Sequence, residues 1–468
     1  MKMWSGRFRQ PLDAEFESWQ RSFPFDRRLV AQEVAASKAH AHALFIARVL
    51  SEDELTAILG GLDSIAQRAA EVPGFLEDAE AEDVHHFVER QLAASIGDTG
   101  LKLHTGRSRN EQIATDLRLF VREAIDQLSA SLVEVIGGLL RQAERAGDAA
   151  MPAYTHLQRA EPVMVAHWLL AYAEMFLRDS ERLADCRKRV NLCPLGSGAV
   201  AGATLTLDRE MLAAELGFTA PTANSMDATS DRDFAVEFVQ NLSLLAVHLS
   251  RWAEEMILFS TQEYGFVRLP QAYSTGSSAM PQKQNPDSLE LIRGKAGRVV
   301  GASLSLLVVT KGLPLAYNKD LQESQEPVFA ASDTVLASLK IAAGFIAAVE
   351  FDRARMQAAA GKGFMNAMAA ATYLVRRGVP FRRAHEQVGK AVQYCLEKGC
   401  ELEALSLTEL RKFSPDFADD VYSHLTLAAV LACHDVPGGT APSRVQEEIN
   451  ALRKRIGNQI GRAHDAGA

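Results

Sequence analysis

The stretch FAVEFVQNLSLLAVHLSRWAEEMILF, residues 234–259, is apolar over much of the circumference of a helix. A helix with apolar side chains on most of its sides must bury most of them. We therefore expect a long buried helix from about Ser230 to about Gln262, with Ser230 and Asp233 forming its cap. This length far exceeds the mean of about 11–12 residues for helices in globular proteins, which favours a helix bundle.

Further long helices are expected on both sides of this stretch, over residues 108–145, 160–190, 288–310 and 326–349. One chain would have difficulty covering so many apolar helices, so we expect an elongated bundle that also packs against sister chains. Shorter helices are expected over residues 27–95 and beyond about residue 355. The sequence shows no convincing strand periodicity, so the predicted fold class is all-α.

The chain has 468 residues, which allows one to three domains. We expect an N-terminal helical domain over residues 1–106, ending in a loop from Gly97 to Gly106. A central long-helix bundle is expected over residues 107–355, and a small C-terminal helical domain over residues 356–468.

The composition argues against several classes of partner. The net charge is −9 and no long basic run is present, so neither nucleic acid nor an anionic membrane is expected as a partner. The longest apolar run, residues 299–310, is too short to span a bilayer. The N-terminal segment lacks the apolar region of a secretory signal, and the five cysteines contain no C-x-x-C pair. We expect a reduced, cytoplasmic protein.

The stretch STGSSAMPQKQNPDSLE, residues 274–290, interrupts the helical pattern and is followed at once by a helix. Residues 276–278 combine two hydroxyls with unpaired backbone N–H groups, and Lys283 stands just before the helix begins. Hydroxyl, ammonium and the positive end of the helix would together stabilise an anion. Asp287 and Glu290 also fit a capping box, so a wholly structural role for Glu290 is the alternative.

A second polar segment, KLHTGRSRNEQ (102–112), places Ser108 and Glu111 as a capping box at the start of a long helix. The capping box does not account for Arg107, Arg109 and Asn110. Two arginines and an amide beside free backbone N–H groups suit a site for carboxylates. A purely structural role for them is the alternative.

Two more segments carry polar residues near helix ends. MPAYTHLQ (151–158) places Thr155 and His156 at an expected helix start. A single histidine is more often structural, and it gains a catalytic role only with a partner carboxylate. In NSMDATSDRD (224–233), Arg232 taken alone would be interpreted as the partner of a neighbouring aspartate.

The patterns of common cofactor and metal sites are missing from the sequence. GSGAVAG (196–202) departs from the dinucleotide-binding spacing and follows no expected strand. His85 and His86 are adjacent, and no H-E-x-x-H motif is present. We therefore expect no cofactor and no metal site.

These segments together carry a resemblance to a known family. GSSAMPQKQNPDSLE resembles the loop pattern G-S-S-x-M-P-x-K-x-N of the fumarase/aspartase superfamily. TGRSRNEQ, YTHLQRAEPV, NSMDATSDRDF and LAYNKDLQE (315–323) narrow the resemblance to the argininosuccinate lyase family. The resemblance implies a homotetramer whose long helices form a 20-helix core, with each active site built from loops of three subunits. It implies reversible β-elimination of argininosuccinate to L-arginine and fumarate, the last step of arginine biosynthesis, without a cofactor.

The resemblance also assigns roles by motif position. Ser277 is implied as the general base that removes a Cβ proton, and Lys283 and Asn285 would stabilise the resulting aci-carboxylate carbanion. His156 is implied to protonate the leaving nitrogen, oriented by Glu290. The implied substrate-binding residues are Ser22, Asp83, His85, Ser108, Arg109, Asn110, Thr155, Arg232, Asn285, Tyr317 and Gln322.

Ser22 belongs to the segment SFPFD, which with Asp26 aligns near the arginine end of the substrate. The chain departs from the family pattern at a few positions. Gln284 and Gln325 stand where lysines are usual, and Glu111 stands where Asp is usual. No catalytic position is lost, so we expect an active enzyme whose loop 274–288 is mobile and closes on substrate.

Two alternatives remain at this point. The loop pattern is shared by sister lyases that release fumarate, namely adenylosuccinate lyase, aspartase and fumarase. The same scaffold also occurs in catalytically silent, crystallin-like structural proteins, for which loss of Ser277 or His156 would be expected. The segments TGRSRNEQ and LAYNKDLQE favour argininosuccinate as the substrate.

Overall fold

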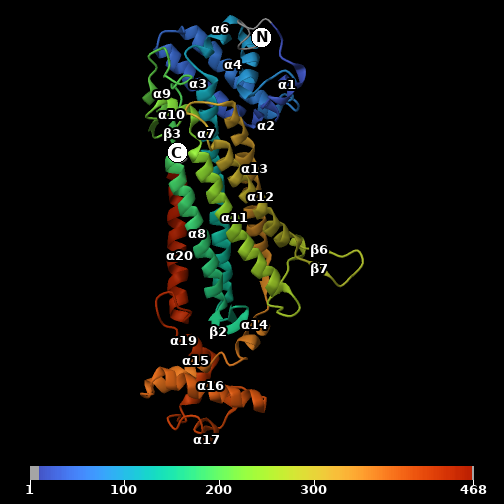
Figure 1. Cartoon of the computed structure of the whole chain (residues 1–468), viewed down its shortest axis with the longest axis vertical. Helices are drawn as coiled ribbons and strands as arrows, with labels where there is room; N and C mark the ends of the chain where they lie inside the picture. The colour runs from blue at the N-terminus through green and yellow to red at the C-terminus, as the bar shows by residue number, and fades with distance from the viewer. Residues whose placement is uncertain (1–9, 466–468) are drawn as a thin grey trace. The chain divides into compact units, whose positions relative to one another are not determined.

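The computed structural model describes the backbone of residues 10–465 and the side chains of residues 10–457. It is predominantly helical with a few short strands, which confirms the all-α prediction (Figure 1). The chain divides into two compact units. Unit 1 comprises residues 1–129, 179–246 and 295–336, and unit 2 comprises residues 130–178, 247–294 and 337–468. The three-domain division expected from the sequence stays a prediction.

The predicted long helices are present with small shifts at their ends. They are α7 (Arg109–Ala146), α8 (Val165–Val190), α11 (Asp233–Ser260), α12 (Asp287–Thr310) and α13 (Gln325–Ala348). Residues 319–348 are long and apolar enough to cross a membrane by length and composition, but half of the most apolar window is buried in the protein. The core helix of a soluble bundle has the same composition.

The remaining elements of unit 1 are shorter than α7, α8 and α11 and include one small sheet. They are α1 (Ala14–Trp19), α2 (Phe23–Asp26), η1 (Arg27–Leu29), α3 (Val30–Ile46), α4 (Glu52–Glu71), α5 (Val84–Ile96), α6 (Asp98–Leu101), η2 (Lys102–His104), β3 (Leu192–Cys193), α9 (Arg209–Glu215), β4 (Ala220–Pro221), α10 (Ser225–Ser230) and η4 (Lys319–Ser324). The loop expected over residues 97–106 is wrong in part, because α6 and η2 occupy most of it.

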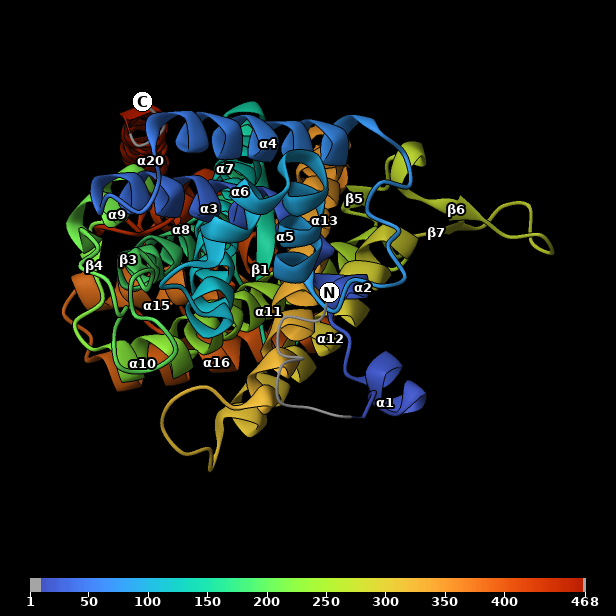
Figure 2. The ribbon, with the colours of Figure 1, turned by 90° about the horizontal axis from the view of Figure 1, so that it is seen from above.

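Helices α3, α4 and α5 pack together in unit 1 (Figure 2). A capping box between Ser51 and Glu54 starts α4 and satisfies N–H groups that a helix end leaves unpaired. A Cβ placed on Gly61 would lie only 2.5 Å from the Leu92 side chain. Glycine at this position therefore permits the close approach of α4 to α5.

Unit 2 contains the other strands and the C-terminal helices. They are β1 (Ala150–Thr155), β2 (Gln158–Met164), β5 (Val267–Arg268), η3 (Gln271–Tyr273), β6 (Thr275–Gly276), β7 (Gln284–Asn285), β8 (Glu350–Phe351), α14 (Arg353–Ala360), α15 (Ala367–Arg376), α16 (Phe381–Lys398), η5 (Leu402–Ala404), α17 (Leu407–Leu410), α18 (Val421–Leu425), α19 (Leu427–Ala432) and α20 (Pro442–Asp465). The expectation of shorter helices beyond residue 355 holds except for α20, which has 24 residues.

A β-hairpin stands where the sequence suggested a helix start. Strands β1 and β2 pair antiparallel from Ala150↔Met164 to Thr155↔Gln158. The prediction failed because strand pairing is a non-local interaction, and Pro152 and Pro162, which face each other in the ladder, disguise the strand pattern.

The turn end of this hairpin lies against a cluster of aromatic rings in unit 2. The Tyr154 ring centroid is 5.9 Å from that of Phe259 and 5.5 Å from that of Tyr264. Trp168 packs on Phe259 at 5.6 Å and donates its indole N–H to Glu255 at 2.7 Å. Because these rings pack against Tyr154, which lies two residues before His156, they order the turn end of the hairpin.

Candidate active site

The loop between α11 and α12 has an ordered stem. Thr275 pairs with Asn285 and Gly276 with Gln284 in the β6–β7 ladder. The Ser288 hydroxyl donates to the Tyr273 carbonyl at 2.6 Å. In Figures 1 and 2 the tip of this loop extends away from α12, which begins beside it. A rigid stem with an extended Gly–Ser tip is the geometry of a segment that can close over a ligand.

Ser277 stands at the first bend of this tip. Its Oγ accepts hydrogen bonds from the backbone N–H groups of Ala279 at 3.3 Å and Met280 at 3.1 Å. Backbone donors aimed at an oxygen favour its ionised form. Lys283 is exposed in the same tip, and the Asn285 amide donates to the Gly276 carbonyl at 3.4 Å.

The predicted capping box of Asp287 and Glu290 differs in the structure. Asp287 is the first residue of α12 and its carboxylate accepts the Thr275 hydroxyl, so this side chain fastens the loop stem. Glu290 is exposed on the first turn of α12, and its backbone N–H donates to the Pro286 carbonyl at 3.0 Å. The Glu290 carboxylate is therefore available to a partner outside the helix.

His156 and Leu157 form the two-residue turn of the β1–β2 hairpin. Both have positive φ angles, 53° and 57°. Such turns normally use Gly or Asn, because other residues are strained in this region. Thr155 and His156 are exposed at the hairpin tip. Among residues 10–457, no hydrogen bond or ion pair joins His156 to Glu290 within the chain.

Unit 1 gathers most of the predicted substrate-binding residues. Arg109 Nη1 lies 2.9 Å from Asp83 Oδ2 and 3.1 Å from Glu82 Oε1. Asp83 also caps α5 by accepting the His86 N–H at 2.8 Å. Burial lowers the pKa of Arg109, but the charges of Asp83 and Glu82 outweigh it and raise that pKa. The guanidinium at the start of α7 is thus held in place and charged.

Ser108 and Asn110 flank this arginine at the start of α7. The predicted capping box is half formed, because Glu111 accepts the Ser108 N–H at 3.0 Å while the Ser108 Oγ accepts from Asn110 at 3.3 Å. The Asn110 side-chain amide donates to the Ala199 carbonyl at 3.2 Å, and Ala199 lies in the Gly-rich segment 196–202.

Arg232 is a buried cation with spare hydrogen-bonding capacity. Its side chain donates from Nε to the Ser324 hydroxyl at 3.2 Å and from Nη1 to the Asp231 carbonyl at 2.7 Å. Nη2 is buried and has no partner among the described residues. Burial lowers the pKa of Arg232 to about 10. The Arg232 charge acts on the buried Tyr317 hydroxyl, so these two predicted residues are neighbours. The Asp231 side chain, rather than that of Ser230, caps α11 by accepting the Asp233 N–H at 2.7 Å.

Ser22 and Gln322 are buried near the N-terminal helices of unit 1. The Ser22 N–H donates to the Glu82 carbonyl at 2.9 Å, and the Gln322 amide donates to the Gln20 carbonyl at 3.1 Å. Asp26 accepts the Val84 N–H at 3.0 Å. Burial, followed by the charge of Asp83, raises the pKa of Asp26 to about 7. Such a carboxyl group would ionise readily beside a cationic ligand.

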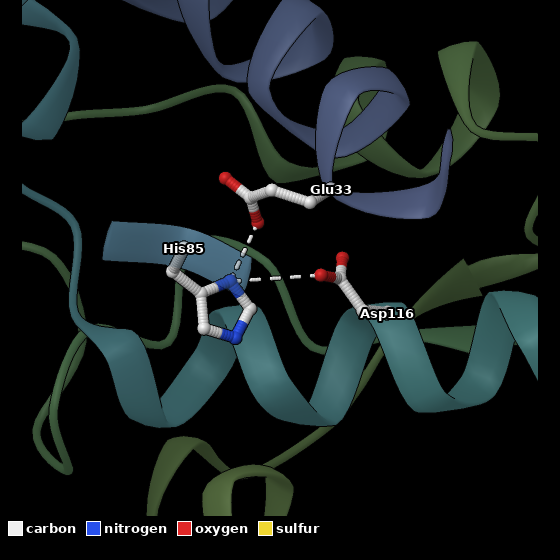
Figure 3. A group of neighbouring side chains, drawn as sticks. All are labelled: Glu33, His85 and Asp116. Atoms are coloured by element: carbon white, nitrogen blue, oxygen red, sulfur yellow. Dashed lines mark hydrogen bonds and ion pairs between the residues drawn. The ribbon is translucent and has the colours of Figure 1, made fainter. Parts of the chain in front are cut away.

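His85, predicted to bind substrate, is more deeply buried than expected. Its Nδ1 lies 2.8 Å from Glu33 Oε2 and 3.6 Å from Asp116 Oδ2 (Figure 3). The ligand atoms of these three side chains lie within 4.8 Å of one another, so they are the group that could hold a metal. Glu33 and Asp116 were missed in the sequence. The available signal was an acidic residue on a largely apolar helix face, shared with Val30 and Ala36 for Glu33 and with Ile113 and Leu119 for Asp116.

The predicted residues thus fall into two sets. Unit 1 holds Ser22, Asp83, His85, Ser108, Arg109, Asn110, Arg232, Tyr317 and Gln322. Unit 2 holds Thr155, His156, Ser277, Lys283, Asn285 and Glu290. The first set carries buried and half-buried charge suited to binding carboxylates and a guanidinium. The second set carries the candidate base and acid on a loop and a hairpin.

Comparisons with known proteins identify the family. The Lyase family model matches residues 6–301, and the model of the argininosuccinate lyase C-terminal domain matches residues 364–432. The chain is 60% identical over 456 residues to the argininosuccinate lyase of Koribacter versatilis (strain Ellin345), covering 97% of this chain and 98% of the relative. It is 59% identical over 465 residues to that of Acidobacterium capsulatum, covering 98% and 96%.

Solved structures show the same fold at lower identity. EDDS lyase in complex with formate superposes with a TM-score of 0.85 at 24% identity, covering 98% of this chain and 93% of that one. Class II fumarase from Schistosoma mansoni gives a TM-score of 0.73 at 15% identity, covering 85% and 89%. The fold is therefore that of the fumarase/aspartase superfamily, and within it the chain belongs to the argininosuccinate lyase family.

Proposed function

We propose that the protein cleaves argininosuccinate reversibly to L-arginine and fumarate, as its relatives' names indicate for them. The observation that carries the proposal is the position of Ser277, whose Oγ accepts two backbone N–H groups at the tip of an extended loop. A serine supported in this way is suited to act as a base once the loop closes on substrate and excludes water.

In the proposed reaction, Ser277 takes the proton from the carbon next to a substrate carboxylate. The electron pair is held on that carboxylate as an aci-carboxylate, stabilised by Lys283 and Asn285. The C–N bond then breaks to give fumarate, and the leaving guanidinium nitrogen takes a proton from His156, which Glu290 orients. Buried charges such as Arg232 would bind the carboxylates, and Asp26 would face the guanidinium end.

We propose that the complete site forms in a homotetramer, from loops of three subunits. Exposed apolar side chains on α12, including Val300, Leu304 and Val308, supply an apolar face suited to packing against other helices. We place the enzyme in the cytoplasm, acting in the last step of arginine biosynthesis.

The proposal is tested by incubating the purified protein with argininosuccinate and following fumarate by its ultraviolet absorbance. Wild-type protein should release fumarate, and the Ser277→Ala variant should release almost none while keeping its fold. The matched control is Ser278→Ala in the same tip, which should keep most of the activity. If the folded wild type releases no fumarate from argininosuccinate, adenylosuccinate, aspartate and malate are tried next, and failure with all of them would favour a structural role.

A further inference from the structure

Three buried side chains from different helices of unit 1 meet near the predicted substrate-binding residues Asp83 and Arg109. Glu33 comes from α3, His85 from α5 and Asp116 from α7 (Figure 3). Their side chains are 1%, 2% and 0% exposed, with His85 Nδ1 between the carboxylates at 2.8 Å and 3.6 Å. Asp116 lies two turns along α7 from Arg109, and His85 lies two residues after Asp83. The group therefore joins the starts of two helices that carry predicted substrate residues.

Glu33 is the ionised member of the group. Its Oε1 accepts the Ser37 hydroxyl at 2.7 Å and the Gln112 amide at 2.9 Å, while Oε2 faces His85. The Arg107 guanidinium lies 3.8 Å away. Burial alone would raise the pKa of Glu33, but the charges of His85 and Arg107 lower it overall. A carboxylate with this many donors is stable as an anion inside the protein.

Asp116, unlike Glu33, lies where no donor groups from residues 10–457 stabilise a negative charge. Both of its carboxyl oxygens are buried and, among the described residues, neither has a hydrogen-bond donor. Two ionised carboxylates in contact inside a protein repel each other, so one of them takes a proton. Burial, together with the charge of Glu33 and a hydrogen bond to it, raises the pKa of Asp116 well above its ordinary value. A protonated Asp116 can donate its O–H to Glu33.

The remaining nitrogen of His85 is turned away from this pair. Figure 3 shows Nε2 on the side of the ring opposite Glu33, and it has no hydrogen-bond partner among the side chains of residues 10–457. Burial acts to lower the pKa of His85, but the charge and hydrogen bond of Glu33 outweigh it and raise that pKa. Because Nδ1 lies between two carboxylates, this geometry favours the protonated ring, whose Nε2–H has no acceptor among the described side chains.

We propose that Glu33 and Asp116 share one proton and act as positioning residues that hold His85 as an imidazolium, with its Nε2–H offered to a substrate carboxylate. The inference deepens the proposed function and rests on it. A bound metal ion is the competing interpretation of the same cluster. The proton is favoured because Glu33 Oε1 already accepts from Ser37 and Gln112 and lies near the Arg107 cation, which would repel a metal ion.

Other titratable and charged groups act on this network from the surrounding elements. They are Asp26 on α2, His40 on α3, Asp83 and Glu89 at α5, and His104, Arg107 and Arg109 before and at the start of α7. Because their charges also change with pH, pH profiles must be compared between matched variants rather than interpreted from wild type alone.

The first test detects the shared proton directly. Infrared difference spectra of the unliganded full-length protein at pH 7 should show the carbonyl stretch of a protonated carboxyl group that disappears in Asp116→Asn. The exposed Asp53→Asn, on the first turn of α4, is the control and should leave the band unchanged. An unchanged band in Asp116→Asn would overturn the proposal, and so would one tightly bound metal ion per chain by elemental analysis.

The second test measures the effect on substrate. In Glu33→Gln the imidazolium loses its nearer counter-charge at 2.8 Å and keeps only Asp116 at 3.6 Å, so KM for argininosuccinate should rise at pH 8 with a smaller change in kcat. KM should partly recover at pH 6, where solution protonates His85, and Glu33→Asp should restore part of the affinity at pH 8. His85→Gln should raise KM without recovery. Equal effects of Glu33→Gln at both pH values would contradict the proposal.

The two proposals fail in different ways. If wild-type protein does not cleave argininosuccinate, the proposed function fails, whatever the infrared band shows. If wild type is active but the band or the pH-dependent KM is missing, only the proton-sharing network fails. Circular dichroism and size-exclusion chromatography of every variant identify any loss of folding or assembly.

Discussion

Arg109 Nη1 lies 2.9 Å from Asp83 Oδ2, so the first residue of α7 is paired with the residue that caps α5. An arginine predicted to bind a substrate carboxylate is thus already held by a carboxylate of the protein. The pair fixes the direction of the guanidinium before substrate arrives, which reduces the ordering that binding must impose.

Replacing Asp83 by Asn should therefore impair substrate binding more than folding. Asn is as good a helix cap as Asp, so the melting temperature should change little, whereas Arg109 loses its orienting charge. We expect kcat/KM to fall about tenfold or more, measured by fumarate absorbance. Glu82→Gln is the matched control and should have a smaller effect. An unchanged kcat/KM in Asp83→Asn would show that the pair only stabilises the fold.

Arg232→Met should raise the folding stability of the unliganded protein and weaken its binding of fumarate. A buried cation with an unpartnered Nη2 costs stability, and an apolar side chain of similar length removes that cost, by about 1–3 kcal/mol. The same change removes a donor from the proposed carboxylate site. Thermal melts with and without fumarate measure both effects. Fumarate should stabilise wild type and have little effect on Arg232→Met; equal stabilisation of the two would place the fumarate carboxylates elsewhere.

Asp26 should make arginine binding dependent on pH. Its pKa is raised to about 7, so the group is largely protonated at pH 6 and largely ionised at pH 8. Because a guanidinium binds the ionised form, affinity for arginine should rise across this range and binding near pH 7 should release a proton. Calorimetry in buffers of different ionisation enthalpy measures that proton. Asp26→Asn should abolish the dependence, and Asp53→Asn should preserve it.

The same raised pKa has a consequence for stability. An acid whose pKa is higher in the folded state than in the unfolded chain weakens folding as the pH rises from about 4 to about 7. The unliganded wild type should therefore be most stable near the acidic end of this window, as far as Asp26 is concerned. Denaturant titrations of wild type and Asp26→Asn at both ends should differ most at pH 7, and a constant difference would contradict this account.

Leu157→Asn should stabilise the β1–β2 hairpin. Leu157 has a φ of 57° and its side chain is 69% exposed. A left-handed conformation costs most residues about 1–2 kcal/mol and costs Asn less, so a gain of about 1 kcal/mol is expected in thermal melts. Leu101→Asn, on an exposed helical residue of α6, is the control and should give no gain. A loss of stability in Leu157→Asn would mean that the assembled protein covers this side chain.

The long helices were predictable because their apolar side chains recur through α7, α8, α11, α12 and α13, and this periodicity is local information. The polar segments at their ends were also visible, because residues such as Arg109 and Ser277 stand where a helix starts or a loop bends. The roles given to them came from the family resemblance, because a role in catalysis depends on a substrate that the sequence does not contain.

The failures concern interactions between distant parts of the chain. The β1–β2 hairpin was missed because its strands are defined by pairing with each other, and the helix cap at Asp231 was assigned to Ser230 by a simple spacing rule. The partners of His85 could not be deduced, because Glu33 and Asp116 come from helices 52 residues earlier and 31 residues later in the sequence. Burial brings such acids together, and sequence alone does not indicate that they meet.

Gly344 lies inside α13, where a Cβ would fall 1.9 Å from the Tyr273 hydroxyl. Tyr273 immediately precedes the segment that carries Ser277, and its carbonyl accepts the Ser288 hydroxyl from the other side of the stem. An alanine at 344 is a mild, helix-favouring replacement by every local rule, yet it would displace the ring that anchors the loop. Gly344→Ala would therefore lower catalytic activity from a position inside a helix, while the amount of folded protein in the cell stays nearly normal.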